Sequence, residues 1–267
     1  ITKWCDPESL SHELIEPSLE WQDLGLTSRS DIIISVAALL EEQKSKFLYL
    51  LMHEAGKTLE DAADEIREAV DFLRYYAQQA QSFNPIMQNG PTGEDNLLEI
   101  SPKGIVLCIS PWNFPLAITV GQIAAALVTG NTVISKPSEH TSLISYEAMQ
   151  LFYDQGVPCE ALHLLLGDGF LGQQIVEQQQ LDLVVFTGSF KTAKNIHKSL
   201  ADKDGKIVSL IAETGGLNSM IVDSSALLER ACDDIVRSAF NSAGQRCSAL
   251  RLLMVHEEIY LELIGYD

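Results

Sequence analysis

The sequence predicts an α/β fold in which a parallel sheet carries helices on both faces. Short apolar runs of strand length alternate with helix-like runs between residues 105 and 212. Such alternation indicates strand–helix–strand crossovers, which join parallel strands. The strand-like runs are continuously apolar, as expected for a sheet that is buried on both faces. With 267 residues, 46% of them hydrophobic, the chain can also bury a large core.

Helices are expected in the N-terminal part of the chain. Residues 1–28 show little periodicity and predict an irregular lead-in. Apolar residues recur at helical spacing over residues 31–52, which predicts a helix. Thr58 with Asp61 resembles a capping box, and it opens a long amphipathic helix that runs to about residue 80.

The alternating part of the chain follows residues 84–104, which are rich in Asn, Pro and Gly and predict a connection. The predicted strands are 105–109, 132–135, 162–166, 183–186 and 207–212. The predicted helices between them are 116–128, 142–154, 171–179 and 191–200. Parallel sheets bind ligands beyond the carboxyl ends of their strands. Binding residues are therefore expected where each strand ends.

A second, smaller α/β region is predicted for residues 215–267. It contains a strand at 219–222, a helix at 227–240 and a strand at 250–255. These residues are too few for a domain of the usual ~100–150 residues. We therefore expect a domain boundary at residue 214 and a chain that stops inside its second domain.

Composition excludes several classes of function. The net charge of −19 argues against nucleic-acid binding, which requires clustered Lys and Arg. We expect no signal peptide in residues 1–6, because no apolar segment follows a charged one there, and the longest apolar run, 116–128, is too short to span a bilayer. Five cysteines without close pairs predict reduced thiols in a cytoplasmic protein. Six scattered histidines predict no metal site.

One cysteine lies in a segment that is either catalytic or structural. The segment reads Ala243-Gly244-Gln245-Arg246-Cys247-Ser248. Nucleophilic thiols react as thiolates and need electropositive, partly open surroundings, which Arg246 could supply to Cys247. Free cysteines are more often small core residues, as predicted for Cys108 in a strand and Cys232 in a helix. The segment alone leaves both interpretations of Cys247 open.

Two segments after strands carry possible nucleotide-binding residues. Residues 167–172 match the dinucleotide-binding glycine pattern, with Gly169 at its centre, but the acid expected after the next strand is missing. A pyrophosphate site and an ordinary loop both stay open there. Lys136, Ser138 and Glu139 place a cation and a carboxylate past another strand end. Glu139 either accepts both ribose hydroxyls or belongs to a solvated turn.

Three further strand ends carry polar or small residues. Gly188 and Ser189 would direct a helix N-terminus towards a phosphate or a nicotinamide ring. Asn113, in a loop fixed by flanking prolines, either donates its amide N–H to a developing oxyanion or caps the following helix. Glu213 is either catalytic or a surface carboxylate, and Gly215 after it leaves room for a ligand.

Together these segments resemble the NAD(P)-dependent aldehyde dehydrogenase family. The matching segments, in the family's order, are Trp112-Asn113-Phe114-Pro115, Lys136-Pro137-Ser138-Glu139, Phe186-Thr187-Gly188-Ser189, Glu213-Thr214-Gly215-Gly216 and Gly244-Gln245-Arg246-Cys247. Residues 54–58, 65–77 and 241–251 resemble the glutamate-semialdehyde (pyrroline-5-carboxylate) dehydrogenase branch, especially the dehydrogenase half of the bifunctional proline utilisation A enzymes. The resemblance covers roughly residues 28–256.

The resemblance also has departures. Ala193 stands where most members of the family have a second glycine, although the proline-enzyme branch also has alanine there. Lys191 stands where that branch usually has an acid. The family's downstream Glu-x-Phe-Gly-Pro segment is absent.

The resemblance implies a Rossmann-type NAD-binding domain with a helical lead-in over residues 1–214, and the N-terminal part of a truncated catalytic domain over 215–267. It implies that Cys247 is the nucleophile, Glu213 the base and Asn113 an oxyanion donor. It implies a substrate contact for Ser248. Cofactor contacts are implied for Pro111, Trp112, Lys136, Ser138, Glu139, Gly169, Gly188, Ser189 and Gly215.

The implied reaction is NAD-dependent oxidation of L-glutamate γ-semialdehyde to glutamate in proline catabolism, through a cysteine thiohemiacetal and a thioester. We expect this truncated chain to have little activity alone. The resemblance implies a homo-oligomer and leaves open a fusion to a proline dehydrogenase half. Two alternatives remain: a dehydrogenase of another aldehyde such as succinate semialdehyde, and a non-catalytic nucleotide-binding fragment.

Overall fold

The computed structural model describes residues 15–83 and 85–265. Predictions for residues 1–14 lie outside this part. The chain forms two compact units, residues 1–213 and 214–267. The assignment of a cofactor-binding and a catalytic role to these two parts stays a prediction.

A five-stranded sheet forms the centre of the first unit, and its strand order is β5-β4-β3-β6-β7. The strands are β3 (Ile105–Ile109), β4 (Thr132–Lys136), β5 (Leu162–Leu164), β6 (Leu183–Gly188) and β7 (Ser209–Thr214). β3 pairs in parallel with β4 and β6, and β4 pairs in parallel with β5. These pairings confirm the predicted parallel α/β fold.

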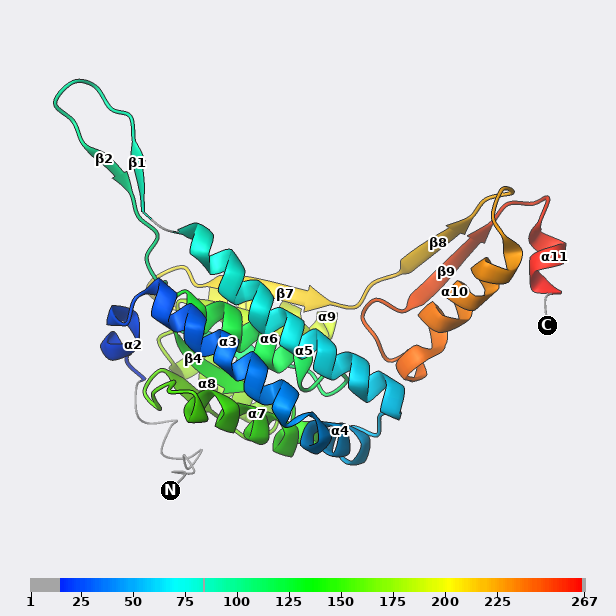
Figure 1. Cartoon of the computed structure of the whole chain (residues 1–267), viewed down its shortest axis with the longest axis horizontal. Helices are drawn as coiled ribbons and strands as arrows, with labels where there is room; N and C mark the ends of the chain where they lie inside the picture. The colour runs from blue at the N-terminus through cyan, green and yellow to red at the C-terminus, as the bar shows by residue number, and fades with distance from the viewer. Residues whose placement is uncertain (1–14, 84, 266–267) are drawn as a thin grey trace. The chain divides into compact units, whose positions relative to one another are not determined.

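Helices cover both faces of the sheet (Figure 1), and side chains of the central strands belong alternately to two hydrophobic cores. Val106 and Cys108 face the larger core, whereas Ile105 and Leu107 face the smaller one. The larger core is covered by α3 (Leu26–Glu42), α4 (Lys44–His53), α5 (Leu59–Ala80), α6 (Ala117–Val128) and α7 (Ser142–Asp154). The smaller core is covered by α8 (Gly169–Gln178) and α9 (Phe190–Ala201). The predicted burial of both faces is therefore confirmed.

The N-terminal helices differ from the prediction in two ways. Residues 15–28 are not irregular throughout, because α2 (Leu19–Asp23) forms there and buries Trp21. The indole Nε1–H of Trp21 donates to the carbonyl of Leu127 at 2.8 Å, which ties α2 to the end of α6. The predicted helix over 31–52 is divided at Gln43, whose backbone leaves the helical region (φ −89°, ψ 13°).

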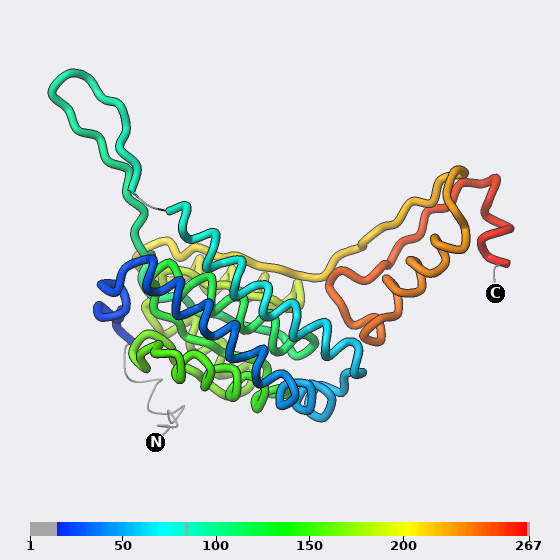
Figure 2. The backbone as a smooth tube through the Cα atoms, in the orientation of Figure 1, coloured from blue at the N-terminus to red at the C-terminus, as the bar shows by residue number. Residues whose placement is uncertain are grey.

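A β-hairpin occupies the predicted connection. After the short 3₁₀ helix η1 (Gln81–Phe83), strand β1 (Ile86–Gln88) pairs antiparallel with β2 (Asn96–Leu98). The hairpin extends away from the sheet of its unit (Figure 2), and every residue of both strands is exposed. Residues 84–104 were predicted only as a connection, and the strands of this hairpin were not predicted. Without burial on one face, these strands lack the alternating pattern by which a strand is recognised in sequence.

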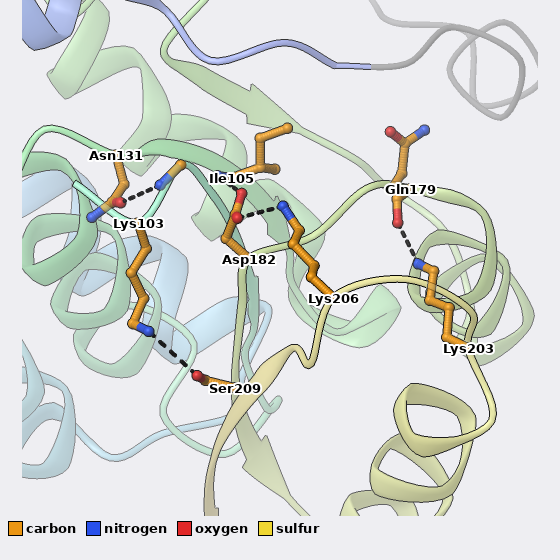
Figure 3. A network of polar contacts seen from close by, with 9 residues as sticks. Lys103, Ile105, Asn131, Gln179, Asp182, Lys203, Lys206 and Ser209 are labelled. Atoms are coloured by element: carbon orange, nitrogen blue, oxygen red, sulfur yellow. Dashed lines mark hydrogen bonds and ion pairs between the residues drawn. The ribbon is translucent and has the colours of Figure 1, made fainter. Parts of the chain in front are cut away.

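Polar contacts fasten the strands at the end of the sheet opposite to the carboxyl ends (Figure 3). The Oδ2 atom of Asp182 accepts the backbone N–H of Ile105 at 2.8 Å, and Oδ1 pairs with Lys206. Asn131 Oδ1 accepts the N–H of Gly104 at 3.0 Å. Gly104 has φ +124°, and a Cβ there would lie 2.4 Å from Asp182 Oδ2, so no larger residue fits. The starts of β3 and β6 are thus fixed together.

The second unit contains a parallel strand pair. β8 (Asn218–Val222) pairs with β9 (Leu250–Val255), and α10 (Leu228–Phe240) lies between them in sequence. The 3₁₀ helix η3 (Asn241–Gly244) and helix α11 (Tyr260–Ile264) complete the unit. The predicted strand–helix–strand order is confirmed for the described residues, although no side chain of α10 is buried.

Candidate active site

Segments that were predicted to bind a cofactor follow adjacent strands at one edge of the sheet. Ile109, the last residue of β3, is in register with Lys136 of β4 on one side and Phe186 of β6 on the other. The segments that follow these strands carry Pro111, Trp112 and Asn113, then Ser138 and Glu139, then Gly188 and Ser189. The fold therefore brings these segments to the edge where parallel sheets bind ligands.

The loop after β3 leads directly into α6. Asn113 in this loop is half-buried, and Trp112 is exposed. Glu65 of α5 accepts the backbone N–H groups of Leu116 and Ala117 through Oε1, at 2.8 and 3.2 Å. These two donors at the start of α6 therefore need no cap from Asn113, which removes much of the support for the capping interpretation.

Lys136 is a buried cation at the end of β4, with only 4% of its surface exposed. Burial lowers the pKa of this ammonium, and the carboxylates of Glu139 and Asp168 oppose that shift. Nζ lies 3.8 Å from Oε2 of Glu139, which is too long for a hydrogen bond. The ammonium and carboxylate therefore form a charged pair that still has hydrogen-bonding capacity for a ligand.

The glycine-rich turn before α8 carries its own carboxylate cap. Asp168 Oδ1 accepts the N–H groups of Phe170 and Leu171 at 3.0 and 3.2 Å. A carboxylate at this helix N-terminus opposes the binding of a phosphate to the same amides. Of the two interpretations left open for this turn, the geometry favours the ordinary loop, and the cofactor contact of Gly169 stays a prediction.

Both serines of the predicted cofactor set accept local hydrogen bonds. Ser189 Oγ accepts the N–H of Thr192 at 3.2 Å and caps α9. Ser138 Oγ accepts the N–H of His140 at 3.3 Å and caps the 3₁₀ helix η2 (Glu139–Thr141). At Gly188, a Cβ would lie 2.6 Å from the aromatic ring two residues earlier in the chain. A larger residue at Gly188 would therefore have to displace the Phe186 ring.

Glu213 lies on β7 with an exposed side chain. The pKa of the Tyr76 hydroxyl on α5 is raised mainly by burial. Tyr75 and the charge of Glu213 raise it further. The carboxylate is therefore close enough to Tyr76 for its charge to act there, a neighbour that the sequence did not predict. Gly215, two residues on, belongs to the second unit, and a Cβ there would meet no atom within 4 Å.

Cys247 and Ser248 belong to the second unit, and both are exposed. The carbonyl of Cys247 accepts the side-chain N–H of Asn218 at 2.6 Å, and the same nitrogen donates to Ala249 O at 3.0 Å. Cys108 is buried, as predicted, and burial raises the pKa of its thiol. Of these two cysteines, only Cys247 has the open surroundings that a nucleophilic thiolate needs.

The backbone just before Cys247 is strained. Ser242 and Ala243 have φ values of 53° and 54°, and Gly244 has φ +68°. Left-handed backbone at non-glycine residues costs about 1–3 kcal/mol and is concentrated at functional sites. Arg251 helps to hold this turn, because its Nη2 donates to Gly244 O at 2.5 Å. The turn therefore supports a functional interpretation of the cysteine segment.

Two polar residues that support the loop after β3 were not among the predicted site residues. Glu65 accepts the amides at the start of α6, as described above. Gln122 of α6 donates through Nε2 to Ile109 O at 3.3 Å and to Thr187 Oγ1 at 3.1 Å, which joins the ends of β3 and β6. For Gln122 the available signal was a polar residue within an apolar stretch, and for Glu65 it was a charged residue at helical spacing among the apolar positions of an amphipathic helix.

Within residues 15–83 and 85–265, no group of three or more His, Cys, Asp and Glu side chains has the arrangement of a metal site. In the same part of the chain, no helix combines the length and apolar character that crossing a membrane requires.

Comparison with known proteins places these features in a family. The model of the aldehyde dehydrogenase family matches residues 15–265. The bifunctional protein PutA of Rhizobium meliloti is 47% identical over 237 residues, which cover 88% of this chain and 18% of PutA. A 1-pyrroline-5-carboxylate dehydrogenase of Anoxybacillus flavithermus is 36% identical over 250 residues, which cover 92% of this chain and 48% of that enzyme.

Solved structures agree with this placement. A mutant of PutA from Bradyrhizobium japonicum superimposes with a TM-score of 0.90 at 48% identity, over 92% of this chain and 26% of that one. Betaine aldehyde dehydrogenase from Staphylococcus aureus, solved with NAD⁺, gives a TM-score of 0.87 at 29% identity, over 92% and 48%. The chain thus spans half or less of the length of these relatives. From its match to the family model over all of the described residues, this chain belongs to the aldehyde dehydrogenase family.

Proposed function

We propose that the protein with this sequence oxidises L-glutamate γ-semialdehyde, the open form of pyrroline-5-carboxylate, to glutamate with NAD. The observation that carries the proposal is the combination of an exposed Cys247 with identities of 34–47% to proteins named PutA or 1-pyrroline-5-carboxylate dehydrogenase. Those names supply the substrate class. The residues of the candidate active site supply the chemistry.

In the proposed reaction, the Cys247 thiolate adds its electron pair to the aldehyde carbon. The carbonyl oxygen becomes an oxyanion that accepts N–H bonds from the Asn113 amide and the Cys247 backbone. NAD, when bound, supplies the hydride acceptor through which the thiohemiacetal carbon reaches the oxidation level of a thioester. Glu213 takes a proton from water, the water oxygen attacks the thioester, and the thiolate leaves as the acid is released. Ser248 contacts the α-carboxylate of the substrate.

The residues at the carboxyl edge of the sheet fit a dinucleotide. Lys136 is a buried ammonium whose carboxylate neighbour lies beyond hydrogen-bond distance, so it can donate to ribose or phosphate oxygens. Glu139 can accept ribose hydroxyls, and the N-terminus of α9 at Ser189 favours a polar group of negative charge. Pro111, Trp112 and Gly188 lie beside these groups in the proposed site. A cofactor contact of Gly215 is also part of the proposal.

The proposal also includes the oligomeric state, the domain fusion and the compartment of the enzyme. A homo-oligomer and a fusion to a proline dehydrogenase half are part of it, the latter because the PutA relatives are named bifunctional. The four cysteines of the described residues are free thiols, which suits a reducing compartment such as the cytoplasm.

The proposed function is tested in the complete gene product with NAD and glutamate γ-semialdehyde, by following NADH absorbance. We expect Cys247→Ala to abolish turnover while the far-UV circular dichroism spectrum and the unfolding midpoint stay unchanged. Cys159→Ala is the matched control, because Cys159 is another exposed free thiol. Iodoacetamide should modify Cys247 first and Cys108 last.

Two results would contradict the proposal. Turnover that survives Cys247→Ala would show that Cys247 is not the nucleophile. A higher kcat/KM for succinate semialdehyde than for glutamate γ-semialdehyde would show that the proposed substrate is wrong. The proposed reaction class, oxidation of an aldehyde, would still hold.

A further inference from the structure

A buried ion pair lies beneath the loop that carries Asn113. Nζ of Lys57 is 2.8 Å from Oε2 of Glu65, and the two side chains are 6% and 0% exposed. Neither atom has a well-aligned hydrogen bond within the described residues, so their attraction is that of an ion pair. Burial raises the pKa of the Glu65 carboxyl, while Lys57 and two backbone N–H groups oppose that shift. Two charges have therefore been taken out of water at one point of the core.

Both members of this pair also contact the loop. Nζ of Lys57 lies 3.8 Å from the centre of the Phe114 ring, a close cation–π contact. The second oxygen of Glu65 accepts the N–H groups of Leu116 and Ala117, as described above. Asn113 directly precedes Phe114. The pair thus holds the segment just after Asn113 through an aromatic ring and through two backbone amides.

The pair is itself held by rigid elements. Glu65 lies on the buried face of α5, and Lys57 donates its backbone N–H to Leu51 O at the end of α4, at 3.1 Å. Thr58 caps α5 immediately after Lys57. The ammonium and carboxylate therefore have fixed positions relative to the sheet, whereas the loop after β3 has no regular structure of its own.

We propose that Lys57 and Glu65 are positioning residues for the oxyanion donor Asn113, and that they act through Phe114 and the start of α6. This inference rests on the proposed function, in which Asn113 binds the oxyanion. A displacement of about 1 Å in such a group can cost about a hundredfold in rate. Donors for an oxyanion contribute most when they are held in place before the reaction.

A purely stabilising role explains the pair less well. Buried ion pairs are weak sources of stability, because desolvation of the two charges offsets their attraction. Neutral residues of similar volume are often as stable. The pair does, however, hold three groups of the loop in place, the Phe114 ring and the N–H groups of Leu116 and Ala117, through directional contacts that a neutral hydrophobic residue does not make. Positional accuracy at the loop is the property that the charges supply.

The test uses Lys57→Met/Glu65→Gln in the complete gene product. This double variant leaves no unpaired buried charge, and the introduced glutamine can still accept the two amides through its side-chain carbonyl oxygen. We expect the unfolding midpoint to stay close to that of the wild type, the Kd for NAD to stay within about twofold, and kcat to fall about tenfold to a hundredfold. Phe114→Leu, which removes the ring but keeps the ion pair, should give the same pattern and replaces the double variant if that variant does not fold.

A double-mutant cycle with Asn113→Ala shows whether the effect passes through Asn113. Asn113→Ala alone should lower kcat about 100- to 1,000-fold. If Lys57 and Glu65 act by placing Asn113, adding their substitutions to Asn113→Ala should change kcat by less than about threefold, because the group that they position is already gone. Lys46→Met is the matched control: Lys46 also pairs with a carboxylate and lies near an aromatic ring, but it does not contact the loop.

Each remaining outcome counts against one identifiable claim. Equal losses of kcat with and without the Asn113 side chain would overturn the positioning role, as would a folded double variant with wild-type kcat. A loss of kcat that is matched by Lys46→Met would also overturn it. If Asn113→Ala itself keeps wild-type kcat, the oxyanion role in the proposed function fails, and the positioning role fails with it.

Discussion

Cofactor choice gives a sharp prediction, because a single carboxylate is proposed to bind the ribose. Glu139 is 45% exposed, and its Oε2 lies 3.8 Å from the buried Lys136 ammonium. If Glu139 accepts the ribose hydroxyls, the extra 2′-phosphate of NADP places like charges about 4 Å apart. The repulsion per pair of unit charges would be about 1 kcal/mol in bulk water and about 4 kcal/mol at an effective dielectric constant of 20.

The partial exposure of Glu139 and the attraction of Lys136 for a phosphate both reduce this repulsion. A net penalty of about 1–3 kcal/mol remains, and each 1.4 kcal/mol corresponds to about tenfold in affinity. We therefore expect NAD to bind about tenfold or more tightly than NADP. Glu139→Gln keeps an acceptor but removes the charge, so NADP affinity should rise until the two cofactors differ by about threefold or less.

Isothermal titration calorimetry with both dinucleotides, at one fixed ionic strength, measures this difference. Glu147→Gln is the control, since Glu147 also pairs with a lysine, Lys46, but lies on α7. Equal affinity of the wild type for NAD and NADP would refute the reasoning. So would a preference that is unchanged by Glu139→Gln.

Two further predictions concern stability. Asp182→Ala should lower the free energy of unfolding in urea by about 2–3 kcal/mol, because the N–H of Ile105 loses a charged acceptor. Asp182→Asn should lower it by about 1 kcal/mol or less. Equal losses for the two variants would show that the exposed pair with Lys206 matters instead. Burial lowers the pKa of His163 below 6.5, so the unfolded state binds more protons and stability falls as the pH drops below about 6.5. His163→Gln should flatten this part of the stability curve, and an unchanged slope between pH 5 and 7 would exclude His163 as its source.

The sequence by itself determined the central α/β architecture. The strand at Ile105–Ile109 and the helix at Ser142–Asp154 have the predicted bounds. A strand that is buried on both faces and a helix with one apolar face follow from the spacing of apolar residues along the chain. The capping box at Thr58 was also predicted correctly, because a cap depends on residues only three positions apart. The placement of predicted binding segments after strands followed from the same local pattern.

Local patterns failed where distant contacts decided the conformation. Residues 19–23 form a helix because Trp21 is buried against the end of α6, more than a hundred positions further along the chain. The exposed hairpin of β1 and β2 gives no burial pattern from which a strand can be recognised. Likewise, the break at Gln43 interrupts a stretch whose apolar spacing continues on both sides.

Only the tertiary structure shows which residues hold the candidate site in place. Asn113 was chosen from its loop, but the residues beneath it, Lys57 and Glu65, lie about 50 positions earlier in the chain. In the sequence, Glu65 is one of several charged residues of a long helix, and nothing nearby indicates that it is buried or which residue is its partner. A buried charge is stable only beside a counter-charge and donors in the folded state. Because the fold brings those partners together, their identity cannot be read from the residues next to it.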